Sequence, residues 1–202
     1  MAAVVAATAF ALLPCCHTVT PQQAATLVRQ MTSRGELLLE DTFHVTHGIE
    51  VDARLIALDQ RLHIQGAELA PGVTLEPGGT ISGAPERPGA FTRPIRLCRP
   101  SGCVEEVVTL VVHRNTPWRP GKLTFPAQTG RPLNETIEIE GGPPDVPPTF
   151  TVTDSGKLPG GVTIGPDGRI GGVPHRAGVF DVPVRVCVAG NCAGVVATLI
   201  VV

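Results

Sequence analysis

The stretch Leu158-Pro-Gly-Gly-Val-Thr-Ile-Gly-Pro-Asp-Gly-Arg-Ile-Gly-Gly-Val-Pro174 decides the fold, because the chain nearly spells it twice. Its earlier copy reads Leu69-Ala-Pro-Gly-Val-Thr-Leu-Glu-Pro-Gly-Gly-Thr-Ile-Ser-Gly-Ala-Pro85. At a constant offset of 89 residues and without a gap, residues 69–112 and 158–201 are identical at 20 of 44 positions. A repeat with a fixed period predicts two copies of one folding unit.

Length and composition agree with two small β-rich units. The chain has 202 residues, which the period divides into two units of about 80 to 90 residues, each able to bury its own core. The 23 Gly and 20 Pro residues are typical of a protein with many turns and few helices. We therefore predict an all-β fold.

Charge and aromatic content exclude some classes of partner. The formal net charge of −2 gives no electrostatic attraction to nucleic acid or to an anionic membrane. Tyr is absent and Trp occurs once, so the aromatic surfaces that often recognise sugars or proteins are scarce.

The cysteines indicate an oxidising compartment. Cys98 and Cys103 hold the same places in the first copy as Cys187 and Cys192 hold in the second. We predict one disulfide in each unit and hence an exported protein. A structural zinc site shared by the four thiols is the alternative, and it is disfavoured because the repeat separates the two pairs by about a domain length.

The N-terminal residues 1–16 look like a signal segment. They contain an uninterrupted apolar run that is too short to span a bilayer but suits the core of a signal peptide. No basic residue precedes the run, and no good cleavage site follows it. Cys15 or Cys16 is a candidate for a lipid anchor of the bacterial type, although Pro14 fits that signal poorly. A buried apolar strand or helix is the alternative.

Residues 17–35 predict a short helix or linker. Thr20 suits the N-cap, and Pro21 suits the first helical position. After this segment the chain reads as a first sandwich over residues 36–113, a semi-rigid proline-containing linker over residues 114–120, and a second sandwich over residues 121–202.

The later half of each unit predicts a β-hairpin. Phe180, Val182, Val184 and Val186 alternate with other residues, which is the period of a half-buried antiparallel strand. We expect a four-residue loop at 99–102 and at 188–191, bracketed by the cysteine pair. Pro94 and Pro183 lie inside the predicted strands, so each requires a β-bulge or an unpaired position in the ladder.

These motifs resemble the Ig-like module of bacterial surface proteins known as He_PIG, which is related to cadherin-like repeats. The matching parts are Leu-Pro-Gly-Gly-Val-Thr from residue 158, Ile-Gly-Gly-Val-Pro from residue 170 and Gly-Val-Phe from residue 178. The first copy matches about equally well. The resemblance implies two tandem Ig-like antiparallel β-sandwich domains on an exported protein, where such modules are spacers, adhesive elements or accessory domains. Phe for the usual Tyr and the hairpin cysteines depart from the pattern.

Loops displayed on a rigid sandwich are the expected place for recognition. The candidate binding residues lie at the two hairpin tips, in the proline-rich insertion at residues 141–148, and at the linker tryptophan. They are Pro100, Ser101, Asn191, Pro143, Pro144, Asp145 and Trp118. Packing of the tryptophan at the junction between the two domains is the alternative.

Other chemistry is weakly supported by the sequence. Asp154 and Asp167 are candidates for calcium by position, but the first copy has no acid at the matching places. His44 and His47 are three apart, so in an extended segment they do not converge on one metal ion. We predict no catalytic, cofactor-binding or metal-binding residue.

The functional prediction is therefore a non-enzymatic, exported bacterial protein that acts as a structural or adhesive module, secreted or in the cell envelope. The alternative is a ligand-binding accessory protein that recognises a glycan or protein partner for an enzyme or surface complex. We expect no nucleic-acid partner, no cofactor and no membrane span.

Overall fold

The computed structural model describes residues 37–202. The predicted signal segment, the predicted N-terminal helix and the possible lipid anchor at Cys15 or Cys16 lie outside these residues. The described part consists of strands, turns and one short 3-10 helix, Ser155–Lys157 (η1), and it contains no α-helix. The all-β class is confirmed for this part of the chain. We call residues 37–113 the first repeat and residues 118–202 the second repeat.

The first repeat is a sandwich of two four-stranded sheets. One sheet has the order β1-β8-β7-β3 and the other the order β2-β6-β5-β4. The strands of the first sheet are β1 (Thr42–Thr46), β8 (Gly102–His113), β7 (Gly89–Arg99) and β3 (His63–Ile64). The strands of the second are β2 (Ala53–Arg54), β6 (Thr80–Ser82), β5 (Val73–Leu75) and β4 (Ala67–Ala70). All pairings are antiparallel except that of β1 with β8.

The second repeat has an equivalent four-stranded sheet of order β10-β17-β16-β13. Its strands are β10 (Thr124–Ala127), β17 (Asn191–Val201), β16 (Gly178–Val188) and β13 (Thr149–Val152). The facing sheet has three strands, β11 (Leu133–Thr136), β15 (Arg169–Gly172) and β14 (Val162–Ile164). In this four-stranded sheet too, the strand that comes first in the chain, β10, is parallel to the one that comes last, β17. This shared strand order supports the predicted Ig-like sandwich fold.

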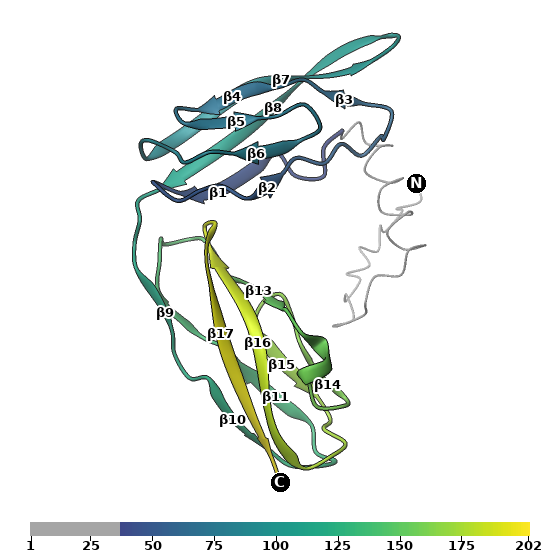
Figure 1. Cartoon of the computed structure of the whole chain (residues 1–202), viewed down its shortest axis with the longest axis vertical. Helices are drawn as coiled ribbons and strands as arrows, with labels where there is room; N and C mark the ends of the chain where they lie inside the picture. Colours follow the sequence, from purple (N-terminus) through teal and green to yellow (C-terminus); the bar gives the residue numbers. More distant parts are fainter. Residues whose placement is uncertain (1–36) are drawn as a thin grey trace, which may run out of the picture.

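Buried side chains form two separate hydrophobic clusters, one in each repeat. Leu69, Leu75 and Leu97 are fully buried in the first cluster, and Phe125, Ile170 and Leu199 are fully buried in the second. The inward positions are those of the predicted alternation, because successive residues of a strand face opposite sides of its sheet. Figure 1 shows the two groups of sheets following one another along the chain.

A small additional sheet ties the connector to the second repeat. Strand β9 (Trp118–Pro120) pairs antiparallel with β12 (Ile139–Gly141). The predicted linker thus includes one strand, and the predicted insertion begins with the last residue of another. The first repeat has a shorter counterpart of this pairing, an antiparallel bridge between Leu38 and Ala57.

The hairpins differ from the prediction in loop length. Pairing of β7 with β8 continues to Arg99 opposite Gly102, and pairing of β16 with β17 continues to Val188 opposite Asn191. Two-residue turns therefore replace the predicted four-residue loops. Ladder hydrogen bonds continue past the disulfide because the linked cysteines lie directly opposite each other.

Pro183 is accommodated without a bulge. The ladder of β16 with β17 runs through Pro183 without a register shift. The carbonyl of Pro183 accepts a hydrogen bond from the backbone N–H of Thr153, on the opposite side from β17. The N and C=O groups of one residue in an antiparallel strand face the same neighbour. The nitrogen of Pro183, which carries no hydrogen, thus faces the place where β13 ends and no ladder partner is needed. Of the two predicted arrangements, a bulge or an unpaired position, the structure has the unpaired position.

Candidate functional site

Both predicted disulfides are present, and each closes a hairpin. Cys98 is bonded to Cys103 and Cys187 to Cys192. We call residues 99–102 the first tip and residues 188–191 the second tip. Figure 1 shows the second tip pointing toward the first repeat, whereas the first tip projects away from the rest of the molecule.

The second tip is buried. Val188 and Ala189 are only 2% and 6% exposed. The hydroxyl of Thr46, itself buried at the end of β1, donates a hydrogen bond of 2.8 Å to the Ala189 carbonyl. Gly190 lies against Val45 of the same strand. The second tip therefore packs on the end of β1 and makes a contact between the two repeats, which we call the junction.

The insertion of the second repeat supports the junction from the other side. A Cβ atom on Gly142 would lie 2.9 Å from the Cγ1 of Val188, so the two residues are in close contact. The backbone N–H of Gly142 also donates to the carbonyl of Pro117 in the connector, at 3.0 Å. Both Gly141 and Gly142 have φ near +80°, a backbone conformation that residues other than glycine rarely adopt. The two glycines thus allow the insertion to approach the connector and the second tip.

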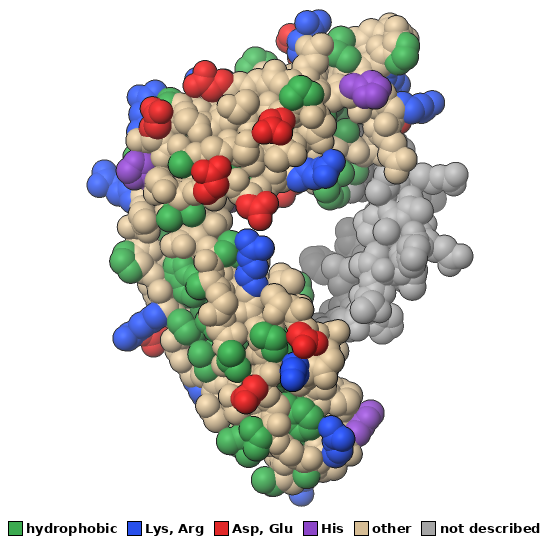
Figure 2. All heavy atoms as spheres, viewed as in Figure 1, with side chains coloured by type: hydrophobic (Ala, Val, Ile, Leu, Met, Phe, Trp, Pro, Cys, Tyr) green, Lys and Arg blue, Asp and Glu red, His purple; other side chains and the backbone are tan. Residues whose placement is uncertain are grey.

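A cleft of about 430 Å³ opens beside the junction. Glu50 and Asp52 of the first repeat line it together with Arg185 and the second disulfide. The Arg185 guanidinium lies 3.6 Å from the Asp52 carboxylate, with both side chains at least half exposed. Figure 2 shows acidic and basic side chains facing each other across the hollow between the two repeats. An exposed pair at this distance contributes little to stability and mainly sets the polarity of the cleft.

The first tip is exposed, in contrast to the second. Pro100 and Ser101 form its turn, and both are exposed. Arg99, just before the turn, reaches back toward the short segment that precedes β3. Its Nη2 atom lies 3.3 Å from the Oδ2 of Asp59.

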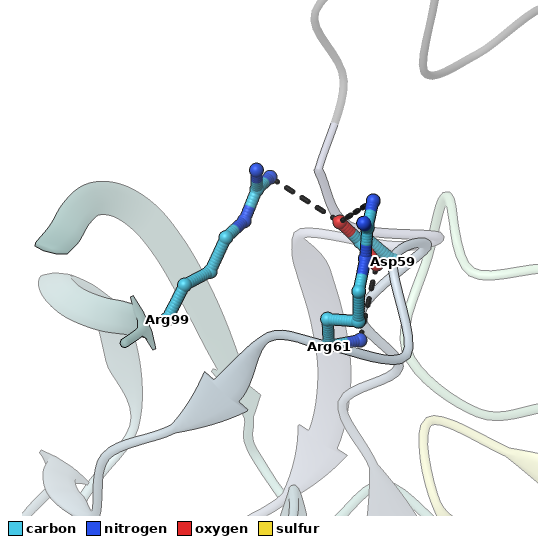
Figure 3. Close-up of polar contacts among 3 residues, drawn as sticks. All are labelled: Asp59, Arg61 and Arg99. Atoms are coloured by element: carbon cyan, nitrogen blue, oxygen red, sulfur yellow. Dashed lines mark hydrogen bonds and ion pairs between the residues drawn. The ribbon is translucent and has the colours of Figure 1, made fainter. Parts of the chain in front are cut away.

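Asp59 holds two arginines at once (Figure 3). Its Oδ1 accepts from the backbone N–H and the Nε of Arg61, at 3.0 and 3.1 Å, and its Oδ2 lies 3.3 Å from the Nη2 of both Arg61 and Arg99. The pKa of Asp59 is lowered, mainly by the Arg61 side-chain hydrogen bond and then by the Arg61 backbone N–H. The carboxylate is therefore ionised at neutral pH, and it orients both guanidinium groups. We call these three residues the arginine cluster.

A cavity of about 450 Å³ adjoins the arginine cluster. Asp59 and Arg54 line it, and the Nη2 of Arg54 donates to the carbonyl of Gly78 at 3.3 Å. Apolar side chains form much of the rest of the wall, including Ile56, which is 47% exposed. The cavity thus combines one arginine and one carboxylate with an apolar surface, and the guanidinium groups of Arg61 and Arg99 lie next to it through their contacts with Asp59.

His44 and His47, which the sequence did not predict to form a metal site, have separate partners in the structure. His44 lies beside His113 on the neighbouring strand, with Nδ1 and Nε2 2.9 Å apart and the rings stacked at 5.2 Å. The ring of His47 instead contacts the Glu86 carbonyl. Burial lowers the pKa of His113, and the charge of His44 lowers it further. Among residues 37–202, no group of three or more His, Cys, Asp or Glu side chains is placed to hold a metal ion.

The remaining predicted binding residues are distributed over the second repeat. Trp118 is half-buried and packs against the core of the second repeat. Pro143 is half-buried, whereas Pro144 and Asp145 are exposed at the insertion. Asn191, at the second tip, is half-buried. The structure brings none of these residues to the first tip.

Sequence reasoning missed the arginine cluster and Thr46. The pattern Asp59-Gln-Arg61 is a local turn signal, because an Asp side chain can accept from the backbone two residues later. Nothing in the sequence indicated that Arg99, 40 residues later, would join it. Thr46 faces the second tip through a contact that spans 143 residues, which no local pattern reports.

No protein-family model matches the chain, and a search of curated proteins gives no match. Among solved structures, human protocadherin-24 EC1-2 is similar with a TM-score of 0.34 and 14% identity, over 82% of this chain and 97% of that one. Drosophila N-cadherin EC1-3 has a TM-score of 0.32 and 15% identity, over 81% and 65%. An endo-fucoidan hydrolase from glycoside hydrolase family 107 has a TM-score of 0.35 and 12% identity, over 80% of this chain and 27% of that one. At such low TM-scores the fold assignment stands on the strand order of the chain itself.

Within residues 37–202, no helix is long and apolar enough to pass through a bilayer.

Proposed function

We propose that the chain is a non-enzymatic, exported protein of the cell surface or envelope, in which two Ig-like β-sandwich domains in tandem form a semi-rigid structural or adhesive module. Residues 36–113 and 121–202 are the two domains of this proposal, and residues 114–120 join them.

The buried second tip is the observation that supports this function best. A freely jointed pair of domains would leave both hairpin tips in solvent. Here Ala189 accepts a hydrogen bond from buried Thr46, and the insertion packs on Val188 from the other side. A contact of this kind restrains bending between the domains, as a spacer or adhesive stalk requires.

The disulfides and the separate cores support export and a structural role. Two hairpin disulfides suit an oxidising compartment. Each repeat buries its own hydrophobic cluster, as independent tandem modules do. The bacterial origin and the relation to He_PIG modules belong to this proposal through their sequence resemblance.

Surface labelling and an adhesion assay on the full chain test the proposal. We expect an epitope-tagged chain to be accessible to antibody and protease on intact cells, with all four described cysteines oxidised. Beads coated with the chain should adhere to cells of the same source more than beads coated with the reduced and alkylated chain. Reduced cysteines in a cytoplasmic fraction, or equal adhesion of both kinds of bead, would contradict it.

The second candidate function is a ligand-binding accessory protein for a glycan or protein partner. The cavity of about 450 Å³ beside the exposed first tip favours it, because that volume is in the usual range of ligand sites. Glycan arrays and pull-downs with the full chain separate the two candidates. A specific partner that releases no product on prolonged incubation supports the accessory function.

A further inference from the structure

The charge of the first repeat is unevenly distributed. Residues 37–113 contain six arginines, no lysine and ten Asp or Glu residues. Three of the arginines and one of the acids belong to the cavity and the arginine cluster, which gives this region a net charge of +2. The rest of the repeat carries three arginines and nine acids, a net charge of −6. A local cationic site within an acidic domain indicates an anionic ligand of limited size.

The guanidinium groups of the arginine cluster are oriented and still have free donors. Arg61 is 82% exposed and Arg99 41% exposed, whereas the Asp59 side chain between them is 18% exposed. A guanidinium has five N–H donors. The contacts to Asp59 use the Nε and Nη2 of Arg61 and the Nη2 of Arg99. No other residue in 37–202 accepts from the remaining donors, which can therefore meet a carboxylate or sulfate, groups that guanidinium binds with paired hydrogen bonds.

A second cationic position lies elsewhere on the same cavity. The contact of Arg54 with the Gly78 carbonyl places it beside the turn at Pro77, away from the turn that holds Asp59. One cationic position in the cavity and another beside it suit a ligand with more than one anionic group. Ile56, which is exposed and also lines the cavity, offers an apolar surface on which the body of such a ligand can lie.

The neighbouring backbone disfavours a peptide ligand. An extended peptide gains most of its affinity by adding a strand to an open sheet edge. The edge strands at this cavity are β2 and β3, and each is only two residues long. A nucleic acid is disfavoured because a long, uniformly charged duplex would also meet the acidic remainder of the repeat.

We propose that the cavity and the adjoining arginine cluster together bind an acidic saccharide, whose carboxylate or sulfate groups pair with Arg54 in the cavity and with Arg61 and Arg99 beside it. This inference rests on the proposed function for a surface protein and names the ligand class of its exposed tip. The equivalent surface of the second repeat cannot serve the same purpose, because its tip is buried at the junction.

Calorimetric titration of the full, oxidised chain tests the inference with five probes: a hexauronate, a sulfated hexasaccharide, a neutral hexasaccharide, an acidic hexapeptide and inorganic sulfate. We expect the acidic oligosaccharides to bind and the neutral one to fail. Raising the salt concentration from about 50 to 200 mM should weaken binding, because the contacts are ionic. The double variant Arg61→Gln/Arg99→Gln should bind about tenfold more weakly or worse.

Arg169→Gln is the matched control. Arg169 forms the same type of local ion pair, with its backbone N–H on the Asp167 Oδ1 at 3.2 Å and its Nε 3.4 Å from the Oδ2, but no second arginine joins it. We expect the control to bind as the unchanged chain does. All variants should retain their thermal midpoints, since the substituted side chains are exposed.

Several results would overturn the inference. The first is that neither acidic oligosaccharide binds. The second is that Arg169→Gln weakens binding as much as the double variant Arg61→Gln/Arg99→Gln does. The third is that inorganic sulfate or an acidic hexapeptide binds as tightly as the acidic oligosaccharides. If cell adhesion persists in the double variant, the proposed function survives and the saccharide site at the first tip does not mediate it. If oligosaccharides bind to a chain that never reaches the surface, the site stands and the proposed function fails.

Discussion

The two hairpin tips occupy equivalent places in the repeats, yet one is buried and the other is exposed. Val188, Ala189 and Gly190 of the second tip correspond to Arg99, Pro100 and Ser101 of the first. Small, uncharged residues let the second tip fit against the end of β1. The first tip carries a charge and extends into solvent, where it joins the arginine cluster.

Backbone conformation separates the tips as well. Ala189 and Gly190 have φ values of 49° and 74°, so both central residues of this two-residue turn are left-handed, as in a type I′ hairpin. A proline ring fixes φ near −65°, which excludes that turn at Pro100. The copied hairpins have thus diverged at the turn while retaining the same disulfide. The second tip forms a contact between the repeats, and the first tip is exposed to solvent.

The strongest test of this comparison exchanges the tip residues. Val188→Arg should lower the free energy of unfolding by about 2–3 kcal/mol, because it forces a charge into the contact with Gly142. The reciprocal variant Arg99→Val should change it by less than about 0.5 kcal/mol, since that position is exposed. Urea unfolding measures both values. Equal effects of the two substitutions would show that the tips do not differ in burial.

Removal of the disulfides should sharpen the comparison. Either double variant, Cys98→Ala/Cys103→Ala or Cys187→Ala/Cys192→Ala, should lose about 2 kcal/mol of stability, the loop-entropy value for so short a loop. Only the second should also broaden the distribution of molecular shapes in small-angle X-ray scattering, because only the second tip holds the junction. Identical scattering of both variants would argue against the junction.

Thr46→Val tests the junction with a change of similar volume. The Ala189 carbonyl loses its buried donor, so we expect a loss of about 1 kcal/mol in unfolding experiments. Gln128 holds the corresponding place after β10 and is exposed. Gln128→Val should therefore have almost no effect, and a comparable loss there would refute the interpretation.

The repeats should also differ, by a smaller amount, in how their stability depends on pH. Residues Pro126 and Val202 of the second repeat stand where the first has His44 and His113. Because the pKa of His113 is lowered from the ordinary 6.5 by burial and by His44, the unfolded chain binds its proton more readily. The contribution of neutral His113 to the free energy of unfolding is therefore fully present above the ordinary pKa of 6.5. It is lost as the pH decreases from there through the lowered pKa of the folded protein. His113→Gln should reduce the drop in thermal midpoint between pH 7 and pH 5.

The sequence predicted the parts of the fold that depend on local pattern. Alternation placed Val182, Val184 and Val186 correctly in the core, and the repeat correctly paired the cysteines. The loop length was wrong because hydrogen bonding continues past the disulfide, which residue type does not reveal. Burial of Ala189 under Thr46 and the meeting of Arg99 with Asp59 were missed, since each depends on residues brought together only by the folded chain.

The parallel pairing of first and last strands has a mechanical consequence. In each repeat the entering strand runs alongside the leaving strand, so tension on the two ends slides these strands past each other. The ladder hydrogen bonds are then loaded together instead of being opened one by one. Strand β1 pairs with β8 over five residue pairs, and β10 pairs with β17 over four. Under steady tension we expect the second repeat to yield first, while the longer ladder of the first repeat still holds.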